Sequence, residues 1–179
     1  KSGEEAFESI LKDLRSAEKF IFMEYFIIGS GVMLDQILDI LKEKVKHGVV
    51  VRIIYDDFGS INAIPPHFIK EMESIGIQTR RFNPYKPMLS VIMNDRDHRK
   101  ILVVDGRVAH TGGYNIADEY INKKIRFGYW KDAGIRVEGE CVNSFTTMFL
   151  EMWNYINKDN AVHDEYLNPH NTFSQSDES

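Results

Sequence analysis

The chain has 179 residues, of which 43% are hydrophobic and 27% are charged. This composition excludes collagen-like, low-complexity and wholly disordered chains, and the length suits one domain that buries roughly two-thirds of the surface exposed in the unfolded chain. A single cysteine, Cys141, excludes an internal disulfide, and no Cys or His accompanies it at a zinc-ligand spacing. The longest nearly uncharged run, 20–34, is shorter than the ~20 residues needed to cross a bilayer.

Charge is distributed unevenly along the chain. Residues 78–136 contain 12 Lys and Arg against 6 Asp and Glu, although the whole chain has a net charge of −5. A cationic stretch in an acidic protein indicates a focused site for anions such as phosphate, and the alternative is an uneven solvated surface. The acidic balance argues against broad coating of nucleic acid, so we expect no nucleic-acid partner.

The first half of the sequence alternates predicted helices and strands. Ser2 and Glu5 have the spacing of a capping box, and apolar residues then follow at helical spacing. The segment 19–28 is apolar on both faces except for Glu24, which predicts a strand covered on two sides. A helix, a strand, a short helix and a third strand follow over 33–47, 49–55, 65–75 and 77–82.

The second half predicts antiparallel pairing. Asp105-Gly106 is a strong signal for a two-residue hairpin turn between two short strands. The patterns place these strands, a short helix, another strand and a final amphipathic helix over 98–104, 107–111, 115–121, 130–137 and 142–156.

Together these elements predict an α/β fold, a mixed β-sheet flanked by helices on both faces. We expect one domain over 1–157. The segment 158–179 is rich in Asn, Ser, Asp and Glu and is predicted to be a polar tail or a linker between lobes.

The clearest chemical pattern begins at the predicted hairpin. His98, Lys100 and Asp105 form H-x-K-x4-D, and Gly113 and Asn115 belong to a G-G-x-N sequence that follows. Residues two apart on a strand face the same side, so an imidazole and an ammonium are placed together. The imidazole can act as nucleophile or base, the ammonium can bind phosphoryl oxygens, and glycine and asparagine allow close approach and donate a hydrogen bond. The pattern therefore predicts attack on a phosphate.

The runs 98–106 and 112–120 resemble the phospholipase D superfamily, and its bacterial cardiolipin synthases in particular. Supporting segments are 24–26, 94–97, 129–132 and 149–153. The resemblance covers about residues 4–157 and implies a phospholipase D-like α-β-α sandwich with one motif, which is a single lobe.

The resemblance also implies roles for the motif residues. His98 would be the nucleophile that forms a phosphohistidine with a phosphatidyl group, and the phosphate would be bound by Lys100, Gly113 and Asn115.

Three acidic residues would support this site. Asp105 would mainly tie the motif strand to its turn, and Asp132 would orient and polarise the His98 ring. Glu24 is an acid inside an apolar strand, so it is expected to be paired either near this site or with a buried cation elsewhere.

Cardiolipin synthases transfer a phosphatidyl group from one phosphatidylglycerol to the hydroxyl of another, without a metal or other cofactor. The resemblance therefore implies a phosphatidyltransferase whose parent protein lies at the bacterial cytoplasmic membrane and meets a phospholipid substrate there, with this piece itself soluble. Such enzymes use two motifs, because one His attacks while the other protonates the leaving alcohol. Only His98 begins such a motif here. We expect a lobe that is weak or inactive alone and needs a second lobe of the parent chain or a homodimer partner.

Two other functions stay open from the residues alone. One is a one-motif phosphodiesterase or nuclease that is active as a homodimer, and the other is a non-enzymatic lobe that only docks phosphate groups.

Some weaker signals have ordinary structural explanations. Asp95 and Asp97 could hold a metal, but alternating acids more often pair with neighbours such as Arg96 and Arg99, so we predict no metal. His110 is expected to be structural, although contact with substrate is an alternative.

Two further segments lie near the motif or at a strand end. Asp56-Asp57 is expected to start a turn. The apolar segment 84–93 forms either a lip that touches acyl chains or part of the core.

Overall fold

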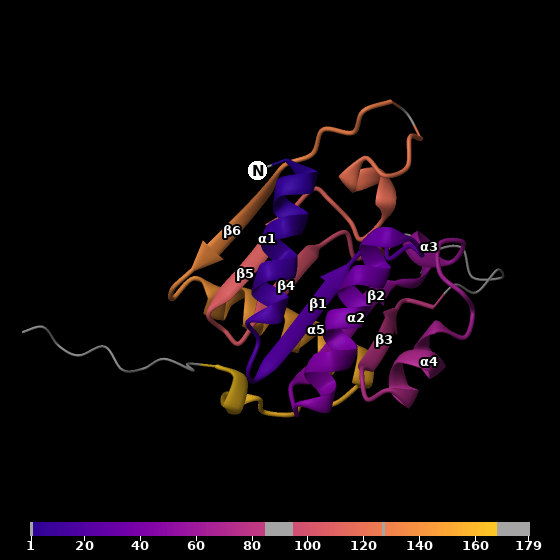
Figure 1. Cartoon of the computed structure of the whole chain (residues 1–179). Coiled ribbons are helices and arrows are strands. Elements are labelled where there is room, and N and C mark those ends of the chain that lie inside the picture. Colours follow the sequence, from indigo (N-terminus) through magenta and orange to yellow (C-terminus); the bar gives the residue numbers. More distant parts are fainter. Residues whose placement is uncertain (1, 85–94, 127, 168–179) are drawn as a thin grey trace, which may run out of the picture.

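The computed structural model describes residues 2–84, 95–126 and 128–167. Its middle layer is a mixed six-stranded sheet in the order β3-β2-β1-β4-β5-β6 (Figure 1). The first three strands are parallel, and β4, β5 and β6 join them by antiparallel pairing. The strands are β1 (Phe20–Tyr25), β2 (Val50–Asp56), β3 (Gln78–Phe82), β4 (Lys100–Val104), β5 (Val108–Gly112) and β6 (Gly134–Glu138).

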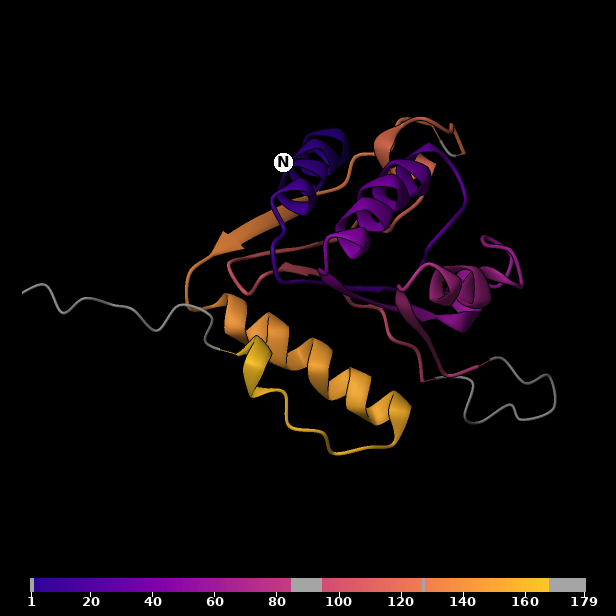
Figure 2. The same cartoon turned by 60° about the horizontal axis from the view of Figure 1, so that its bottom comes forward.

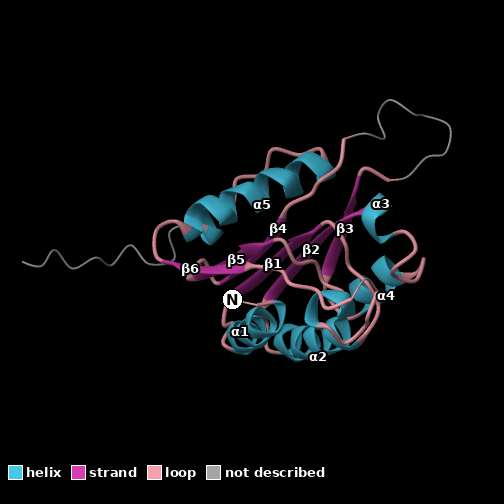
Figure 3. Ribbon diagram, turned by 90° about the horizontal axis from the view of Figure 1, so that it is seen from above, coloured by secondary structure: helices cyan, strands magenta, loops and turns pink. Residues whose placement is uncertain are grey.

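Helices cover both faces of this sheet, as Figure 3 shows when the sheet is seen nearly edge-on. On one side lie α1 (Gly3–Arg15), α2 (Val32–Lys46) and α4 (Phe68–Ser74), and on the other lies α5 (Val142–Asn157). The short elements are α3 (Asp57–Ser60), η2 (Asp118–Ile121) and η3 (Asp164–Tyr166). This arrangement confirms the predicted α/β fold with a mixed sheet between helical layers.

Alternation along the strands creates two apolar cores. In β1, Ile21 and Met23 belong to the core beneath α1 and α2, whereas Phe20 and Phe22 belong to the core beneath α5. Phe22 stacks on Phe149 of α5 with ring centroids 4.6 Å apart, at the near end of the range of about 4.5–7 Å that aromatic pairs prefer. The central strand is therefore apolar on both faces because both faces are covered.

Local sequence signals determine the start of α1 and the turn between β4 and β5. The Ser2 hydroxyl accepts from the Glu5 N–H and the Glu5 carboxylate accepts from the Ser2 N–H, so the capping box opens α1 as predicted. Asp105 and Gly106 both have positive φ, 53° and 63°, which is the geometry of a type I′ hairpin turn between β4 and β5.

The first strand is shorter than predicted because side chains satisfy the backbone near the motif. β1 ends at Tyr25 rather than Ile28, since the N–H of Ile27 donates to Asn115 and that of Ile28 donates to Ser60. The predicted helix over 115–121 is reduced to the single 3-10 turn η2. Its first residue, Asp118, accepts hydrogen bonds from the first N–H groups of α2.

The segment after α5 folds back along that helix (Figure 2). Tyr166 and Leu167 pack against the core on the α5 side. The Arg52 guanidinium lies 5.1 Å from the Tyr166 ring centroid and 5.0 Å from that of Trp153. Packed structure therefore continues up to Leu167, past the boundary expected at residue 157. The reason is that Tyr166, although it lies in a polar part of the sequence, packs against aromatic rings and the Arg52 guanidinium.

Within the described ranges, no helix combines the length and apolar character that crossing a bilayer requires.

Candidate active site

The motif lies at the sheet edge where β1 and β2 end. β4 runs antiparallel to β1, and its first residue, Lys100, pairs with Tyr25, the last residue of β1. No residue of β1 remains to pair with His98, so His98 lies just beyond the sheet. The carboxyl ends of parallel strands are a frequent ligand-binding edge in open α/β sheets.

His98 and Lys100 converge at this edge. The Lys100 ammonium nitrogen lies 3.0 Å from Nδ1 of His98 and donates to the His98 carbonyl oxygen at 2.6 Å. His98 is exposed, whereas Lys100 is only 4% exposed. Because an ammonium has no lone pair, Nδ1 accepts in this contact and a neutral ring carries its proton on Nε2.

The surroundings of Lys100 shift its pKa. Desolvation lowers the pKa of Lys100, while the negative charges of Asp97 and Asp132 act in the opposite direction. An aromatic ring completes the surroundings: Phe26 lies with its centroid 4.8 Å from that of His98 and 5.4 Å from the Lys100 nitrogen. Phe26 is not among the predicted site residues; its signal in the sequence is its place in segment 24–26, which supports the family resemblance, within the strand predicted over 19–28.

Asn115 is buried and its side chain joins two chain segments. Its oxygen accepts from the Ile27 N–H at 2.9 Å, and its amide group donates to the Tyr120 hydroxyl at 2.8 Å. The amide has a second hydrogen, which leaves one donor for a phosphate oxygen. Asn115 also fixes the segment next to Phe26, which itself contacts His98.

Gly113 and Asp132 lie against each other. A Cβ atom on Gly113 would collide with the Asp132 carboxylate, so this approach requires glycine. The carboxylate accepts from the Ala133 N–H at 2.7 Å and from the Trp130 indole at 3.3 Å. Its electrostatic effect reaches Lys100, but the hydrogen bonds among the described residues include none between Asp132 and His98.

Asp105 lies at the other end of β4, seven positions along the chain from His98. Its carboxylate accepts from the N–H groups of Glu18, Lys19 and Phe20 at 2.7 to 2.9 Å and pairs with Arg107 at 3.0 Å. These hydrogen bonds lower the pKa of Asp105 against the opposing effect of desolvation. Asp105 thus joins the hairpin to the start of β1 and does not contact His98.

Glu24 lies near the motif, on the opposite face of the sheet from Lys100. Its carboxyl group is fully buried, and Nε of Arg99 lies 2.7 Å from its Oε1. Arg99 also pairs with Asp97 at 3.0 Å, which is the pairing expected of that acid. Of the two predicted surroundings for Glu24, the structure shows the one near the site.

The remaining weak signals have structural contacts. Asp56 accepts from the Gly59 N–H and so begins the turn of α3. His110 is buried in β5, where its Nε2 lies 2.7 Å from the Asp13 carboxylate. Of the apolar segment 84–93, residues 85–93 lie outside the described residues.

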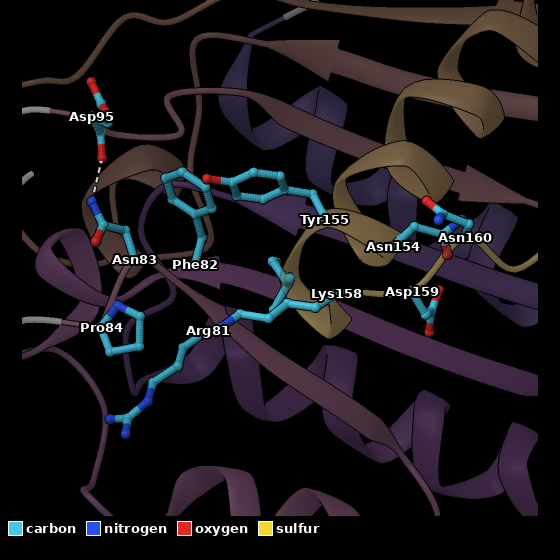
Figure 4. A pocket seen from close by; sticks show the side chains of 11 residues that line it. Arg81, Phe82, Asn83, Pro84, Asp95, Asn154, Tyr155, Lys158, Asp159 and Asn160 are labelled. Atoms are coloured by element: carbon cyan, nitrogen blue, oxygen red, sulfur yellow. Dashed lines mark hydrogen bonds between the residues drawn. The ribbon is translucent and has the colours of Figure 1, made fainter.

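Two cavities flank the motif. One of about 640 Å³ lies between the end of β1, α3 and the residues around Ile125, with Ile27 and Phe58 in its wall. The other, about 700 Å³, lies at the edge formed by β3 and the end of α5; Figure 4 shows Phe82 and Tyr155 there, with Asn83 donating to the Asp95 carbonyl. Neither His98 nor Lys100 lines either cavity. Across the described residues, no three His, Cys, Asp or Glu side chains are grouped so as to hold a metal ion.

An exposed histidine and a buried lysine that meet at the edge of a mixed α/β sandwich define a phospholipase D-like domain. The family described as "Cardiolipin synthase, PLD-like domain" matches residues 10–153, which is most of the chain. The chain therefore belongs to this family.

Curated relatives are similar over nearly the whole chain. A cardiolipin synthase of Alkalihalophilus pseudofirmus is 39% identical over 176 residues, covering 98% of this chain and 35% of that protein. Cardiolipin synthase 2 of Bacillus cereus is 40% identical over 167 residues, covering 93% of this chain and 32% of that protein. An uncharacterized protein of Streptococcus mutans is 52% identical over 158 residues, covering 88% and 34%. The chain thus spans about a third of the length of these relatives.

Solved structures show the same fold. Nuc from Salmonella typhimurium, a phospholipase D family member, has a TM-score of 0.60 at 21% identity, covering 82% of this chain and 86% of that one. Phosphatidylserine synthase of Haemophilus influenzae has a TM-score of 0.62 at 13% identity, covering 87% and 36%.

Proposed function

We propose that this chain is a catalytic lobe of a cardiolipin synthase-like phosphatidyltransferase that works through a phosphohistidine at His98. The observation that supports this most directly is the 3.0 Å approach of Lys100 to His98, with the histidine exposed and the lysine buried. A candidate nucleophile and a cation are thereby in direct contact. The phosphodiester of phosphatidylglycerol is the proposed occupant.

In the first half-reaction, a phosphate oxygen takes the Lys100 ammonium from His98 Nδ1. The ring can then carry its proton on Nδ1 and present the lone pair of Nε2 to phosphorus. The new N–P bond forms as the bond to the glycerol oxygen breaks, and that oxygen takes a proton from an acid on the far side. Lys100 and the free amide hydrogen of Asn115 stabilise the charge on the equatorial oxygens.

In the second half-reaction, the hydroxyl of another phosphatidylglycerol attacks phosphorus and loses its proton to the group that acted as acid. The N–P bond breaks, which releases cardiolipin and restores His98. Water is a competing nucleophile, so the transfer requires that the intermediate be shielded from it. Asp132 is proposed to stabilise positive charge that develops on the ring while the ammonium is engaged by phosphate.

The acid on the far side is proposed to come from a second lobe of the parent chain. Histidine in this role must approach phosphorus in line with the leaving oxygen, which His98 cannot do while it attacks. Because the chain spans about a third of its curated relatives, their remaining length can include such a lobe. The parent protein is proposed to act at the cytoplasmic membrane, where its lipid substrate lies.

The test uses the full-length protein with phosphatidylglycerol labelled in the headgroup phosphate. Acid-labile label on the protein, lost in His98→Ala and converted to cardiolipin on addition of unlabelled phosphatidylglycerol, is the expected result. His67→Ala is the matched control, because His67 has an exposed side chain at the start of α4. Cardiolipin formation by His98→Ala at the wild-type rate contradicts the assignment.

A second candidate is a phosphodiesterase or nuclease that pairs two copies of one motif across a homodimer. This candidate is favoured by the similarity to Nuc, because this chain covers 86% of Nuc, whereas it covers only about a third of the cardiolipin synthases. Hydrolysis of a phosphodiester by a dimer of this chain, without transfer to an alcohol, would support this candidate instead.

A further inference from the structure

A second cluster of charged side chains lies directly behind His98, on the α5 side of the sheet. In the extended segment leading into β4, neighbouring side chains face opposite sides, so Asp97 and Arg99 are directed away from His98 and Lys100. Arg99 pairs with Glu24, which follows Phe22 at a two-residue spacing on the face of β1 that α5 covers, and Asp97 approaches the same Arg99 nitrogen. The residues on either side of His98 in sequence are thereby attached to the central strand.

Contacts extend this cluster to β2. The Arg99 Nε–H donates to Asp97 at 3.0 Å, and Arg99 Nε lies 2.7 Å from Glu24 Oε1. The Asp97 N–H donates to the Asp56 carboxylate at 3.1 Å, and the Arg96 guanidinium lies 3.5 Å from the same carboxylate. The side chains of Glu24 and Asp56 are fully buried, and that of Asp97 is 3% exposed.

The charges of this cluster do not balance. On this face of the sheet, three buried carboxyl groups (Glu24, Asp97 and Asp56) meet two guanidinium groups (Arg96 and Arg99), while the Lys100 ammonium on the other face acts on Asp97 and also on Asp132. The buried residues of α5, which covers this face, are Val142, Thr146, Phe149, Leu150 and Trp153, none of which is charged. A fully ionised cluster would have one more negative than positive charge on the buried face beneath α5, which is costly.

The buried carboxyl oxygens of this cluster also lack hydrogen-bond donors. Among the described residues, both carboxyl oxygens of Glu24 and Oδ2 of Asp97 are buried without a donor. The single hydrogen on Arg99 Nε is already used by Asp97 Oδ1. One proton between Glu24 and Asp97 has two effects: it supplies a hydrogen-bond donor, and it removes the excess negative charge.

We propose that Glu24 and Asp97 share one proton at neutral pH and that this pair positions His98 for catalysis. The acid–carboxylate hydrogen bond joins β1 to Asp97, the residue before His98. The ion pair with Glu24 joins Arg99, the residue after His98, to the same strand. Loss of the proton places two carboxylates against one arginine, and their repulsion loosens the segment 97–99. Consistent with this, burial, and after it Asp97, raises the pKa of Glu24 to about 9, with Arg99 acting in the opposite direction. The positioning role rests on the proposed function, whereas the shared proton does not.

The first experiment detects the proton without any assay of activity. Infrared spectra of the full chain, recorded as wild type minus Glu24→Gln at neutral pH, are expected to contain the C=O band of a protonated carboxyl group. The band should disappear as the pH rises through about 9. It should also be lost in Asp97→Asn, because an amide donor lets Glu24 ionise. Absence of the band at neutral pH overturns the shared proton.

The second experiment detects positioning in the full-length protein. Glu24→Gln retains a donor to Asp97 and an acceptor for Arg99, so it is expected to keep the wild-type kcat and to lose the decline of activity above about pH 9. Lys100 is unchanged in this variant, so its titration cancels in the comparison. Glu24→Ala removes both contacts and should lower kcat roughly 100-fold with little change in KM, since a small misplacement of a reacting group has that cost.

Glu151→Ala, at an exposed site on α5, is the control and should behave as wild type. If Glu24→Gln keeps the alkaline decline, or if a folded Glu24→Ala keeps full activity, the positioning role is overturned. If no form of the protein transfers or hydrolyses a phosphodiester, the proposed function fails, and the infrared result still decides the shared proton.

Discussion

At the scale of single residues, the functional contrast between His98 and Lys100 arises from where two strands end. Lys100 still pairs with Tyr25 and is buried, whereas His98 has passed the end of β1 and is exposed. A difference of two positions therefore separates a buried ammonium from an exposed imidazole, which fits the proposed roles of binding and attack.

Lys100→Ala tests the binding role. We expect kcat/KM of the full-length protein to fall about 10²- to 10³-fold, because a cation next to the developing phosphoryl charge is lost from a buried place. Steady-state kinetics with phosphatidylglycerol measure the change. Lys46→Ala is the matched control, since its side chain is 71% exposed on α2. Equal losses in the two variants would contradict the role.

Asp132→Asn tests the carboxylate beside Gly113. Its negative charge acts on Lys100, so the variant should lower the pKa of Lys100 further and reduce the rate most strongly at alkaline pH. The pH dependence of kcat/KM measures this effect. An unchanged alkaline limb would show that Asp132 acts on the chemistry in another way or not at all.

At the scale of secondary-structure elements, the β4–β5 hairpin is attached to β1 by Asp105. Replacement by alanine leaves three N–H groups without their acceptor, of which only that of Phe20 belongs to a buried residue. The expected loss in the free energy of unfolding is therefore about 2 kcal/mol, which is less than three buried N–H groups without acceptors would cost. Urea denaturation of Asp105→Ala measures it, with the exposed Asp39→Ala in α2 as control.

The same carboxylate predicts a pH dependence of stability. The folded state lowers the pKa of Asp105 below its ordinary value of 3.8, so its contribution is present above that pH and is lost as the pH falls through the lowered pKa. Asp105→Ala should therefore differ from wild type at neutral pH and approach it in strong acid. A constant difference at all pH values would contradict this explanation.

The segment behind α5 gives a second prediction at this scale. Tyr166 contacts Phe20 and Phe22, each with ring centroids 5.0 Å away, and its ring faces Arg52. Tyr166→Ala is expected to lower the free energy of unfolding by about 2 kcal/mol through lost aromatic and cation–π contact. Tyr155→Ala is the control, because Tyr155 is 71% exposed. Equal stability of the two variants would show that the segment adds nothing to the fold.

At the scale of the whole molecule, the single motif predicts how activity depends on concentration. A lobe that lacks its partner should be monomeric and nearly inactive, whereas a homodimeric phosphodiesterase should gain specific activity as its concentration rises through the dimerisation constant. Sedimentation and rate measured over the same concentrations separate the two proposed functions. Full activity of a monomer would contradict both.

The sequence by itself determined the parts that depend on neighbours along the chain. Hydrophobic period separated the helices from the strands, Asp105-Gly106 determined the hairpin, and H-x-K-x4-D identified the chemical pair. These signals act over a few residues and are independent of what packs above them. They were sufficient for the mixed α/β fold and for the family.

Only the tertiary structure decided which distant groups meet. Glu24 and Asp97 are 73 positions apart, and a shared proton between them depends on the register of β1 against β4 and on the burial supplied by α5. The same is true of Tyr166, whose polar surroundings in sequence gave no sign of a core contact. Burial and charge balance are properties of assembled layers, and so no local pattern contains them.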